Sequence, residues 1–255
     1  MTHTLPNGRG HLTLVTDGEA LARAAAARFV ELTRSAVDER GRALVALSGG
    51  STPKRMGELL ATPEFAPYVP WDRTDIFWGD ERWVPLADPE SNAGNALRGW
   101  LERVSTPEHV HPVDTMLADP AAAAAAYEAL IRRIAGGHGT PVFDLILLGM
   151  GDDGHTASLF PETAALDVKN LLVVHNFVPK LDADRITFTY PLIDAAREVL
   201  FLIGGKGKAE TLKAVIDGPA NPRTYPSQAV NPAVGSLRWL VDEAAAANLP
   251  GIGVD

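Results

Sequence analysis

The chain has 255 residues, of which 46% are hydrophobic, with a formal net charge of −9 at pH 7 and no cysteine. This length and apolar content allow a substantial hydrophobic core, and the lack of cysteine excludes disulfides, zinc–thiolate sites and cysteine nucleophiles. The 23 basic residues are scattered, and no segment resembles a signal peptide or an apolar membrane span of roughly 18 residues, so we expect a cytoplasmic protein that binds neither nucleic acid nor membrane.

Strand and helix patterns alternate along the chain. Helical spacing of apolar residues covers residues 21–32, 121–131 and 206–216, whereas residues 185–190 show the alternation of an exposed or antiparallel strand. Apolar runs typical of strands covered on both faces occupy residues 43–47, 75–78, 143–148, 171–174 and 199–203. This order predicts an α/β fold with a doubly wound, mostly parallel, Rossmann-like sheet and helices on both faces, built as a single domain over residues 1–255.

The loops after these strands are the candidates for a site, because ligands of such sheets bind outside the carboxyl ends of the strands. The first loop is Ser48-Gly49-Gly50-Ser51-Thr52-Pro53, with Pro53 at the start of the helix that follows. Its glycines allow close approach of the backbone, and its hydroxyls and helix N-terminus are donors suited to phosphate. The Gly-Lys-Ser/Thr ending of a Walker loop is missing, so an ordinary capped turn is the alternative.

The second loop places Asp80, Glu81 and Arg82 between two tryptophans at the end of the strand at residues 75–78. Two acids and an arginine in this setting are unusual for a solvated turn and make the loop a candidate ligand contact. The alternative is a surface ion pair beside packed aromatic side chains. Further along, Ser91 and Asn92 are first a predicted helix cap and only second a polar site group.

The third loop, GMGDDGHTASLFP at residues 149–161, contains a Gly-x-Gly-x-x-Gly followed at once by His155. A dinucleotide loop would be followed about 20 residues later by an acid at the end of the next strand, and that strand ends in Val-Val-His-Asn. Asp153 lies two residues before His155, where it can orient an imidazole for acid–base work. We therefore expect this loop to hold a catalytic histidine, and a helix to begin near Thr156.

The fourth loop, Gly204-Gly205-Lys206-Gly207-Lys208, brings two lysines to the start of a helix, where an anion is the natural guest. Arg185 either joins these lysines or pairs with Asp184. His109 and His111 have strand-like metal spacing, but no third ligand is evident, so no metal site is expected.

Taken together in this order, the loops resemble the 6-phosphogluconolactonase family, whose fold is shared with glucosamine-6-phosphate deaminases. The resemblance implies an esterase that uses neither metal nor cofactor and hydrolyses a sugar phospholactone, 6-phosphoglucono-δ-lactone, to 6-phosphogluconate in the oxidative pentose phosphate pathway. The motifs that carry it are Ser48-Gly49-Gly50-Ser51-Thr52-Pro53, Asp80-Glu81-Arg82, Ser91-Asn92, residues 149–161, Arg185-Ile186-Thr187, Gly205-Lys206-Gly207-Lys208 and Trp239-Leu240-Val241-Asp242.

The resemblance also implies roles for single residues. His155 would deprotonate the attacking water and return a proton to the ring oxygen of the lactone. Asp153 would orient the imidazole, and loop amides would stabilise the tetrahedral oxyanion. A δ-lactone is an activated ester, so no serine nucleophile is needed. The residues expected to bind the substrate and its phosphate are Ser48, Gly49, Gly50, Ser51, Thr52, Asp80, Arg82, Arg185 and Lys208. Whether Lys206 or Lys208 dominates phosphate binding stays open.

Three alternatives remain. A deaminase of the same fold would carry a glutamate five residues after His155, where this chain has Phe160, although Asp80 is available as a base. A sugar-phosphate sensor of a transcription regulator would need a helix-turn-helix, for which the roughly 40 residues before the first buried strand leave little room. A pocket that binds without catalysis is the third. The choice between monomer and small homo-oligomer, and between δ- and γ-lactone, is also open.

Overall fold

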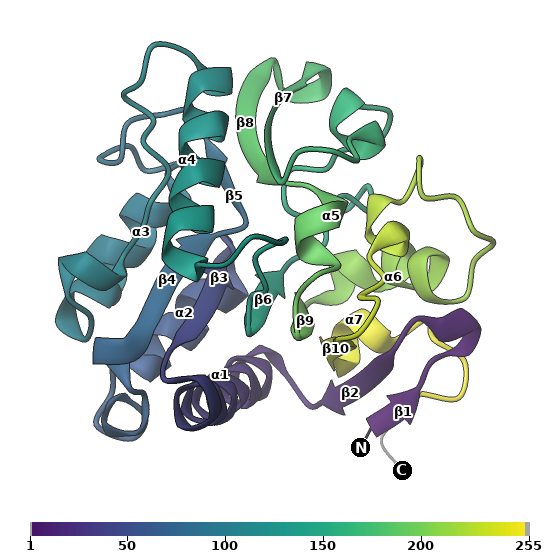
Figure 1. The fold of residues 1–255 in the computed structure, drawn as a ribbon. Helices are drawn as coiled ribbons and strands as arrows, with labels where there is room; N and C mark the ends of the chain where they lie inside the picture. The colour runs from purple at the N-terminus through teal and green to yellow at the C-terminus, as the bar shows by residue number, and fades with distance from the viewer. Residues whose placement is uncertain (1, 253–255) are drawn as a thin grey trace.

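A seven-stranded sheet with the order β1-β2-β10-β9-β6-β3-β4 forms the centre of the computed structural model, which describes residues 2–252 (Figure 1). Only β1 runs antiparallel to its neighbour, β2, and all other pairs in this sheet are parallel. The strands are β1 (Thr2–Thr4), β2 (His11–Val15), β3 (Ala43–Leu47), β4 (Thr74–Trp78), β6 (Leu145–Leu148), β9 (Glu198–Ile203) and β10 (Ser236–Asp242). The predicted doubly wound, mostly parallel sheet is confirmed.

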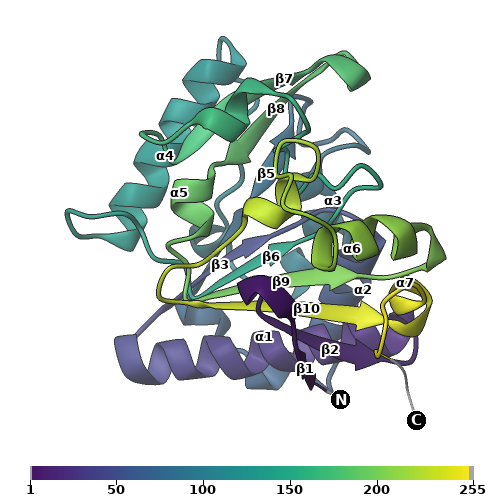
Figure 2. The same ribbon diagram turned by 90° about the vertical axis from the view of Figure 1, so that its right-hand side faces the viewer.

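Helices cover both faces of this sheet, as the edge-on view of Figure 2 shows. One face packs on α1 (Gly18–Arg40), α2 (Ser51–Leu60) and α3 (Asn92–Gly99). The other packs on α4 (Pro120–Ala135), α5 (Tyr190–Ile193), α6 (Ala209–Ile216) and α7 (Glu243–Ala246). Successive residues of β3 enter opposite cores, Val45 and Leu47 on the first face and Leu44 and Ala46 on the second, which explains the uninterrupted apolar runs.

Within residues 2–252, no helix combines the length and the apolar character needed to span a bilayer. The single domain predicted over residues 1–255 stays a prediction, and residues 1 and 253–255 lie outside the described part of the chain.

A second, three-stranded antiparallel sheet has the order β5-β8-β7, with β5 (Asp80–Arg82), β7 (Val173–Val178) and β8 (Ala183–Phe188). The antiparallel strand predicted at residues 185–190 is confirmed as β8. The run at residues 171–174, expected as a strand buried on both faces, leads into β7 of this small antiparallel sheet and not into the central sheet. Val173 and Val174 are buried as expected, whereas Leu171 and, later in β7, Phe177 are exposed. A short apolar run does not reveal which sheet a strand joins, because both environments favour the same residue types.

The helix expected near Thr156 is also absent. Ala157 and Glu162 adopt left-handed backbone conformations, with φ of 47° and 59°, and the Thr156 hydroxyl donates to the carbonyl of Gly149. Residues 156–163 therefore fold back as turns, and the first helical turn after them is a 3₁₀ segment at Ala164–Asp167. α2 begins at Ser51, two residues before Pro53, at which its start was predicted. The cap predicted at Ser91 is confirmed, because Gly94 N at the start of α3 donates to the Ser91 hydroxyl.

The chain order reverses at β3. From β3 the chain continues to β4 on one side, and it later returns through β6 on the other side. The loops that leave the carboxyl ends of β3 and β6 therefore run in opposite directions and open a crevice between them, which is where doubly wound sheets bind ligands.

Asp194, which follows α5, allows the effect of a buried carboxylate on stability to be tested. Its carboxylate accepts a bond from Asn231 N at 2.8 Å, and burial raises its pKa from 3.8 to about 6. A raised carboxyl pKa means that the folded state binds the proton more tightly, so this group favours folding below pH 3.8, and that contribution is lost as the pH rises to about 6. Asp194→Asn keeps an acceptor for Asn231 and should stabilise the fold above pH 7 by about 1–2 kcal/mol.

Urea unfolding of the parent and of Asp194→Asn at about pH 7.5 and about pH 4 measures this effect. The gain should be present at the higher pH and nearly absent at the lower one. Asp72→Asn, at a carboxylate that is 81% exposed, is the matched control and should change neither midpoint. An equal gain at both pH values would contradict the assignment to ionisation.

Candidate active site

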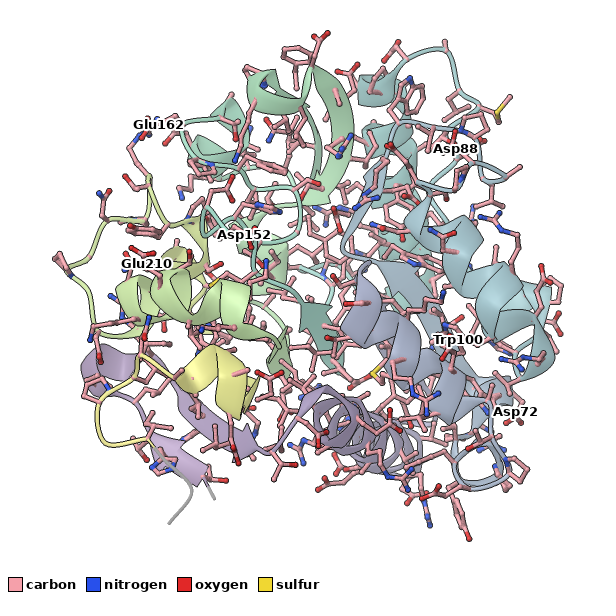
Figure 3. The ribbon with its side chains drawn as sticks, turned by 180° about the vertical axis from the view of Figure 1, so that it is seen from behind. Asp72, Asp88, Trp100, Asp152, Glu162 and Glu210 are labelled. Carbon is pink, nitrogen blue, oxygen red and sulfur yellow. The ribbon has the colours of Figure 1, made fainter. Side chains whose placement is uncertain are left out.

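A cavity of about 420 Å³ opens at the crevice between β3 and β6. Its walls come from the loops after these two strands, from the small sheet and from the 3₁₀ turn before α6; Figure 3 shows Asp152 of this rim near the middle of the molecule, beside α6. The predicted residues that line it are Ser48, Gly49, Gly50, Asp80, Arg82, Asp153, His155, Arg185 and Lys208. Segments far apart in the sequence therefore meet at one site.

His155 is held by a carboxylate on one ring nitrogen. Its Nδ1 lies 2.6 Å from Asp153 Oδ1, and the same oxygen also accepts the backbone amide of His155 at 3.2 Å. A carboxylate can only accept at this position, so this hydrogen-bond network assigns the proton of the neutral ring to Nδ1 and leaves the lone pair on Nε2. Nε2 makes no hydrogen bond to residues 2–252 and the side chain is 26% exposed, so a base is presented to the cavity.

The glycines of this loop make room for the histidine. A Cβ atom at Gly151 would lie 2.0 Å from His155 Nδ1 and 2.8 Å from Asp153 Oδ1. Gly154 has a φ of +77°, and a Cβ atom there would lie 2.7 Å from the Tyr225 ring. At Gly151 a side chain would displace the imidazole, and at Gly154 both the space and the left-handed backbone conformation require glycine. Gly151 therefore makes room for the histidine, and Gly154 allows the turn that precedes it.

Phe160 fixes the plane of the imidazole. The two rings stack with centroids 3.9 Å apart and planes 21° apart, and Phe160 is only 7% exposed. The hydroxyl of Thr163 bonds the Phe160 carbonyl at 2.8 Å, which anchors the end of the turn. Stacking on one face and a carboxylate bond at the edge together restrict both side-chain torsions of His155.

Asp80 lies on the opposite wall and is nearly buried. Ser158 Oγ donates to its Oδ2 at 2.6 Å, and Asn92 Nδ2 donates to its backbone carbonyl at 3.1 Å. Asn92 was predicted first as a cap residue, and its side chain in fact ties α3 to β5. Ser158, from the motif at residues 149–161, connects the histidine loop to the same carboxylate.

Glu81 points away from the cavity, as strand alternation requires. Its carboxylate accepts bonds from Asn92 N at 2.7 Å and Ala93 N at 2.8 Å, and thereby caps α3. Burial raises the pKa of Glu81, and these backbone bonds oppose that effect. Glu81 therefore supports the wall that carries Asp80 and Arg82.

Arg82 and Arg185 line the cavity from neighbouring antiparallel strands. They are direct partners in the register of β5 and β8, an arrangement in which like charges repel. Neither guanidinium forms an ion pair with a carboxylate of residues 2–252; Arg82 donates to the Glu90 carbonyl and Arg185 to the Asp184 carbonyl. Burial and then the Arg82 charge lower the pKa of Arg185. Two unneutralised cations side by side are chemically suited to a phosphate dianion.

Lys208 lines the cavity, whereas Lys206 is not among the lining residues. The Lys208 ammonium lies 2.5 Å from Asp152 Oδ1, and Thr211 Oγ1 donates to the Asp152 carbonyl at 2.7 Å. The rim acid Asp152 is 81% exposed, so an incoming anion can compete with it for Lys208.

Sequence reasoning missed Lys180, which lines the cavity from the turn between β7 and β8. Its ammonium lies 2.9 Å from Asp153 Oδ2. The segment Pro179–Leu181 carries no motif, so only the pairing of the hairpin could reveal this contact.

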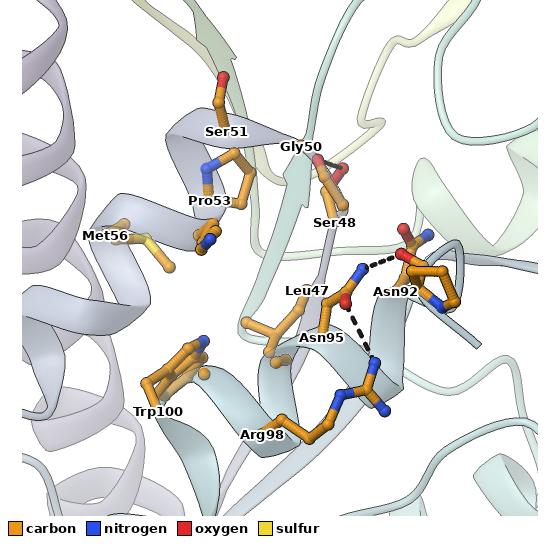
Figure 4. A pocket seen from close by; sticks show the side chains of 15 residues that line it. Leu47, Ser48, Gly50, Ser51, Pro53, Met56, Asn92, Asn95, Arg98 and Trp100 are labelled. Carbon is orange, nitrogen blue, oxygen red and sulfur yellow. Dashed lines mark hydrogen bonds between the residues drawn. The ribbon is translucent and has the colours of Figure 1, made fainter. Parts of the chain in front are cut away.

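Ser51 and Thr52 are not brought to this cavity. Ser51 lines a neighbouring cavity of about 530 Å³ between α2 and α3, which Figure 4 shows with Met56 and Trp100 in its wall. Ser48, Gly49, Gly50 and Asn92 border both cavities. Thr52 lines neither, and the roles of Ser51 and Thr52 in binding stay predictions.

His109 and His111 both contact Asp75, a buried carboxylate at the start of β4, at 3.4 Å and 2.8 Å. Arg42 donates to the second oxygen of Asp75 at 2.6 Å. Within residues 2–252, no three histidine, aspartate or glutamate side chains are arranged to hold a metal ion. The two histidines thus form part of a polar cluster that ties residues 107–111 to the sheet edge.

Comparison with known families gives a match over most of the chain. The family model for glucosamine-6-phosphate isomerases/6-phosphogluconolactonase matches residues 16–239. A 6-phosphogluconolactonase of Synechocystis sp. is 46% identical over 219 residues, which cover 84% of this chain and 88% of the relative. A 6-phosphogluconolactonase of Mycobacterium tuberculosis is 39% identical over 248 residues, covering 94% of this chain and 98% of the relative.

Solved structures agree with these matches. A 6-phosphogluconolactonase from Trypanosoma cruzi superimposes with a TM-score of 0.86 at 29% identity, covering 97% of this chain and 100% of the other. A monomeric glucosamine-6-phosphate deaminase superimposes with a TM-score of 0.77 over 93% of this chain and 99% of the other. At 21% identity, this second likeness concerns the fold alone.

Proposed function

The chain belongs to the glucosamine-6-phosphate isomerase/6-phosphogluconolactonase family, and we propose that it hydrolyses 6-phosphoglucono-δ-lactone to 6-phosphogluconate with His155 as general base. The resemblance predicted from the ordered loops and the assignment to lactone hydrolysis in the pentose phosphate pathway are confirmed by 6-phosphogluconolactonases that are 46%, 45% and 39% identical to this chain. The observation that carries the proposed mechanism is the imidazole whose Nδ1 is bound by Asp153 and whose Nε2 faces the cavity.

The proposed reaction needs one base and one water. Nε2 of His155 takes a proton from the water as its oxygen bonds the lactone carbonyl carbon, and a tetrahedral oxyanion forms. When that intermediate collapses, the bond from this carbon to the ring oxygen breaks, and the imidazolium returns its proton to the ring oxygen. The product acid ionises at neutral pH, so each turnover releases one proton. Asp153 keeps Nδ1 protonated throughout and stabilises the transient imidazolium.

The phosphate of the substrate is proposed to bind at Arg82, Arg185 and Lys208. Among the residues that the structure describes, the two arginines have no carboxylate partner, and the lysine has only an exposed one. A phosphate far from the bond that breaks fixes the orientation of the lactone, so that its binding energy is converted into rate. Gly49 and Gly50 line the same cavity immediately before α2 begins, so their backbone amides are further candidate donors to the phosphate.

The contact between Phe160 and His155 disfavours the deaminase alternative. Phe160 stands where the deaminase branch carries a glutamate, and its ring covers the face of the imidazole. An apolar ring transfers no proton, so the second acid that sugar isomerisation uses is replaced by a packing contact. Incubation with glucosamine 6-phosphate should therefore release no ammonia.

The function is tested by the rate of proton release after the protein, treated with EDTA, is mixed with freshly generated 6-phosphoglucono-δ-lactone. The spontaneous hydrolysis rate is the baseline. Acceleration that survives EDTA supports a lactonase that works without a metal ion. A rate equal to the baseline would reject the lactonase function and favour a sensor or a different sugar phosphate.

Replacing Lys208 by alanine should raise KM about tenfold and leave kcat within about twofold, because a charge-assisted bond to the phosphate is lost while the base is untouched. Asp152→Asn is the matched variant: it frees Lys208 from its competitor and should lower KM. Steady-state kinetics on the lactone measures both changes. A fall in kcat with unchanged KM for Lys208→Ala would place this lysine at the reacting carbonyl instead.

A further inference from the structure

Lys180 reaches the candidate base through a shared carboxylate. It lies in the 3₁₀ turn Pro179–Leu181, at the tip of the hairpin formed by β7 and β8. Its ammonium lies 2.9 Å from Asp153 Oδ2, and Asp153 Oδ1 lies 2.6 Å from His155 Nδ1. Lysine, carboxylate and imidazole therefore form a continuous chain of contacts in the wall of the cavity.

The Lys180–Asp153 pair contributes little to folding. The lysine side chain is 69% exposed, and exposed ion pairs contribute little to stability because water screens them. The pair matters more for the geometry of the site, because the Asp153 carboxylate is held at both oxygens and cannot rotate away from the imidazole. Asp153 itself is largely covered, so the lysine is bound at the side that stays open to solvent.

The other charges around the cavity do not replace Lys180. The neighbouring acid Asp152 is paired with Lys208, and Asp80 on β5 accepts the Ser158 hydroxyl. Arg82 on β5 and Arg185 on β8 face the cavity without contacting Asp153. Within residues 2–252, Lys180 is therefore the only lysine or arginine in contact with the carboxylate that holds His155.

We infer that Lys180 is a positioning residue for His155: it fixes Asp153 for the bond to Nδ1 and offsets the charge that would otherwise favour the imidazolium. This inference rests on the proposed role of His155 as base. The bond to His155 and then the bond to Lys180 hold the pKa of Asp153 well below its usual range, so the carboxylate is ionised whenever the base works. Without the lysine, the uncompensated carboxylate would keep more of the imidazole protonated near neutral pH, and a protonated imidazole accepts no proton from water.

The test is the pH profile of kcat/KM for Lys180→Met between about pH 5.5 and pH 8, with the spontaneous rate subtracted. The acidic limb should move to higher pH by roughly half to one unit, so activity falls several-fold near pH 6 and approaches the parent near pH 8. KM should change less than twofold. Lys180→Arg keeps the charge and should restore the parental profile. Lys213→Met removes a surface lysine paired with Asp217 and should leave the profile unchanged.

The outcomes separate the inference from the proposed function. A Lys180→Met profile that coincides with the parent, while His155→Ala is inactive, overturns the inference and leaves the base in place. A higher KM at every pH with an unmoved acidic limb also overturns it, because the lysine would then contact substrate directly. A uniform loss of kcat that Lys180→Arg fails to restore indicates a structural defect and overturns it as well. Parental activity in His155→Ala would reject the proposed function itself.

Discussion

Replacing His155 by alanine is expected to lower kcat for lactone hydrolysis by about 100- to 10,000-fold, the usual contribution of a positioned acid–base group. The imidazole is the only side chain in the cavity whose geometry presents a free lone pair backed by a carboxylate, among the residues that the structure describes. Without this imidazole, no base in the described part of the cavity is placed to deprotonate the attacking water near neutral pH. Stopped-flow or pH-indicator measurements of proton release, corrected for spontaneous hydrolysis, give the ratio.

The affinity for inorganic phosphate distinguishes lost chemistry from a damaged site in His155→Ala. The proposed phosphate contacts belong to other elements, so calorimetric phosphate binding should stay within about twofold of the parent. Asp153→Asn keeps the size of the side chain, and its smaller loss of kcat should show how much the carboxylate adds to the imidazole. Parental turnover in His155→Ala would exclude the mechanism, and a loss of phosphate affinity would attribute the effect to misfolding of the loop.

Replacing Arg185 by methionine is expected to raise KM about 10- to 100-fold and, at the same time, to make the free protein more stable to heat by about 1–3 °C. The two effects have one cause. Arg185 faces Arg82 across the β5–β8 ladder and is half-buried, with no carboxylate partner in the described part of the chain. The free protein therefore bears a repulsion that a bound phosphate relieves.

Calorimetric scans with and without inorganic phosphate measure the second effect of Arg185→Met. Phosphate should raise the melting temperature of the parent more than that of the variant, because a ligand stabilises only the state that binds it. Arg34→Met removes an exposed arginine of α1 outside the cavity and is the matched control. A variant that is less stable than the parent would show that Arg185 supports the sheet rather than the ligand.

The histidine loop was predictable because its decisive interactions are local. Asp153 and His155 are two residues apart, a Cβ atom at Gly151 would collide with the His155 ring, and Gly154 adopts the left-handed conformation that the turn needs. The same loop also produced an error, the helix expected near Thr156. Left-handed backbone conformations at Ala157 and Glu162 prevent a helix in this segment. Alanine and glutamate rarely adopt this conformation, so the sequence does not predict it.

The phosphate side of the site was predicted as a list of residues, without its geometry. Arg82, Arg185 and Lys208 were expected near a phosphate, but their arrangement follows from the register of β5 with β8 and from the path of the chain before α6. Ser51 and Thr52 shared the motif of Ser48, yet they turn away from the cavity once α2 begins, because successive helical residues point in different directions.

The sequence by itself determined the alternation of strands and helices, the loops at the carboxyl ends of the strands, and the pairing of Asp153 with His155, because these depend on periodicity and on neighbours along the chain. Only the tertiary structure decided that Arg82 lies opposite Arg185, that Phe160 stacks on the imidazole, and that Lys180 contacts the carboxylate of Asp153. Strand register, the folding back of a turn and the placement of a hairpin tip each arise from packing between distant segments, and no local pattern encodes them.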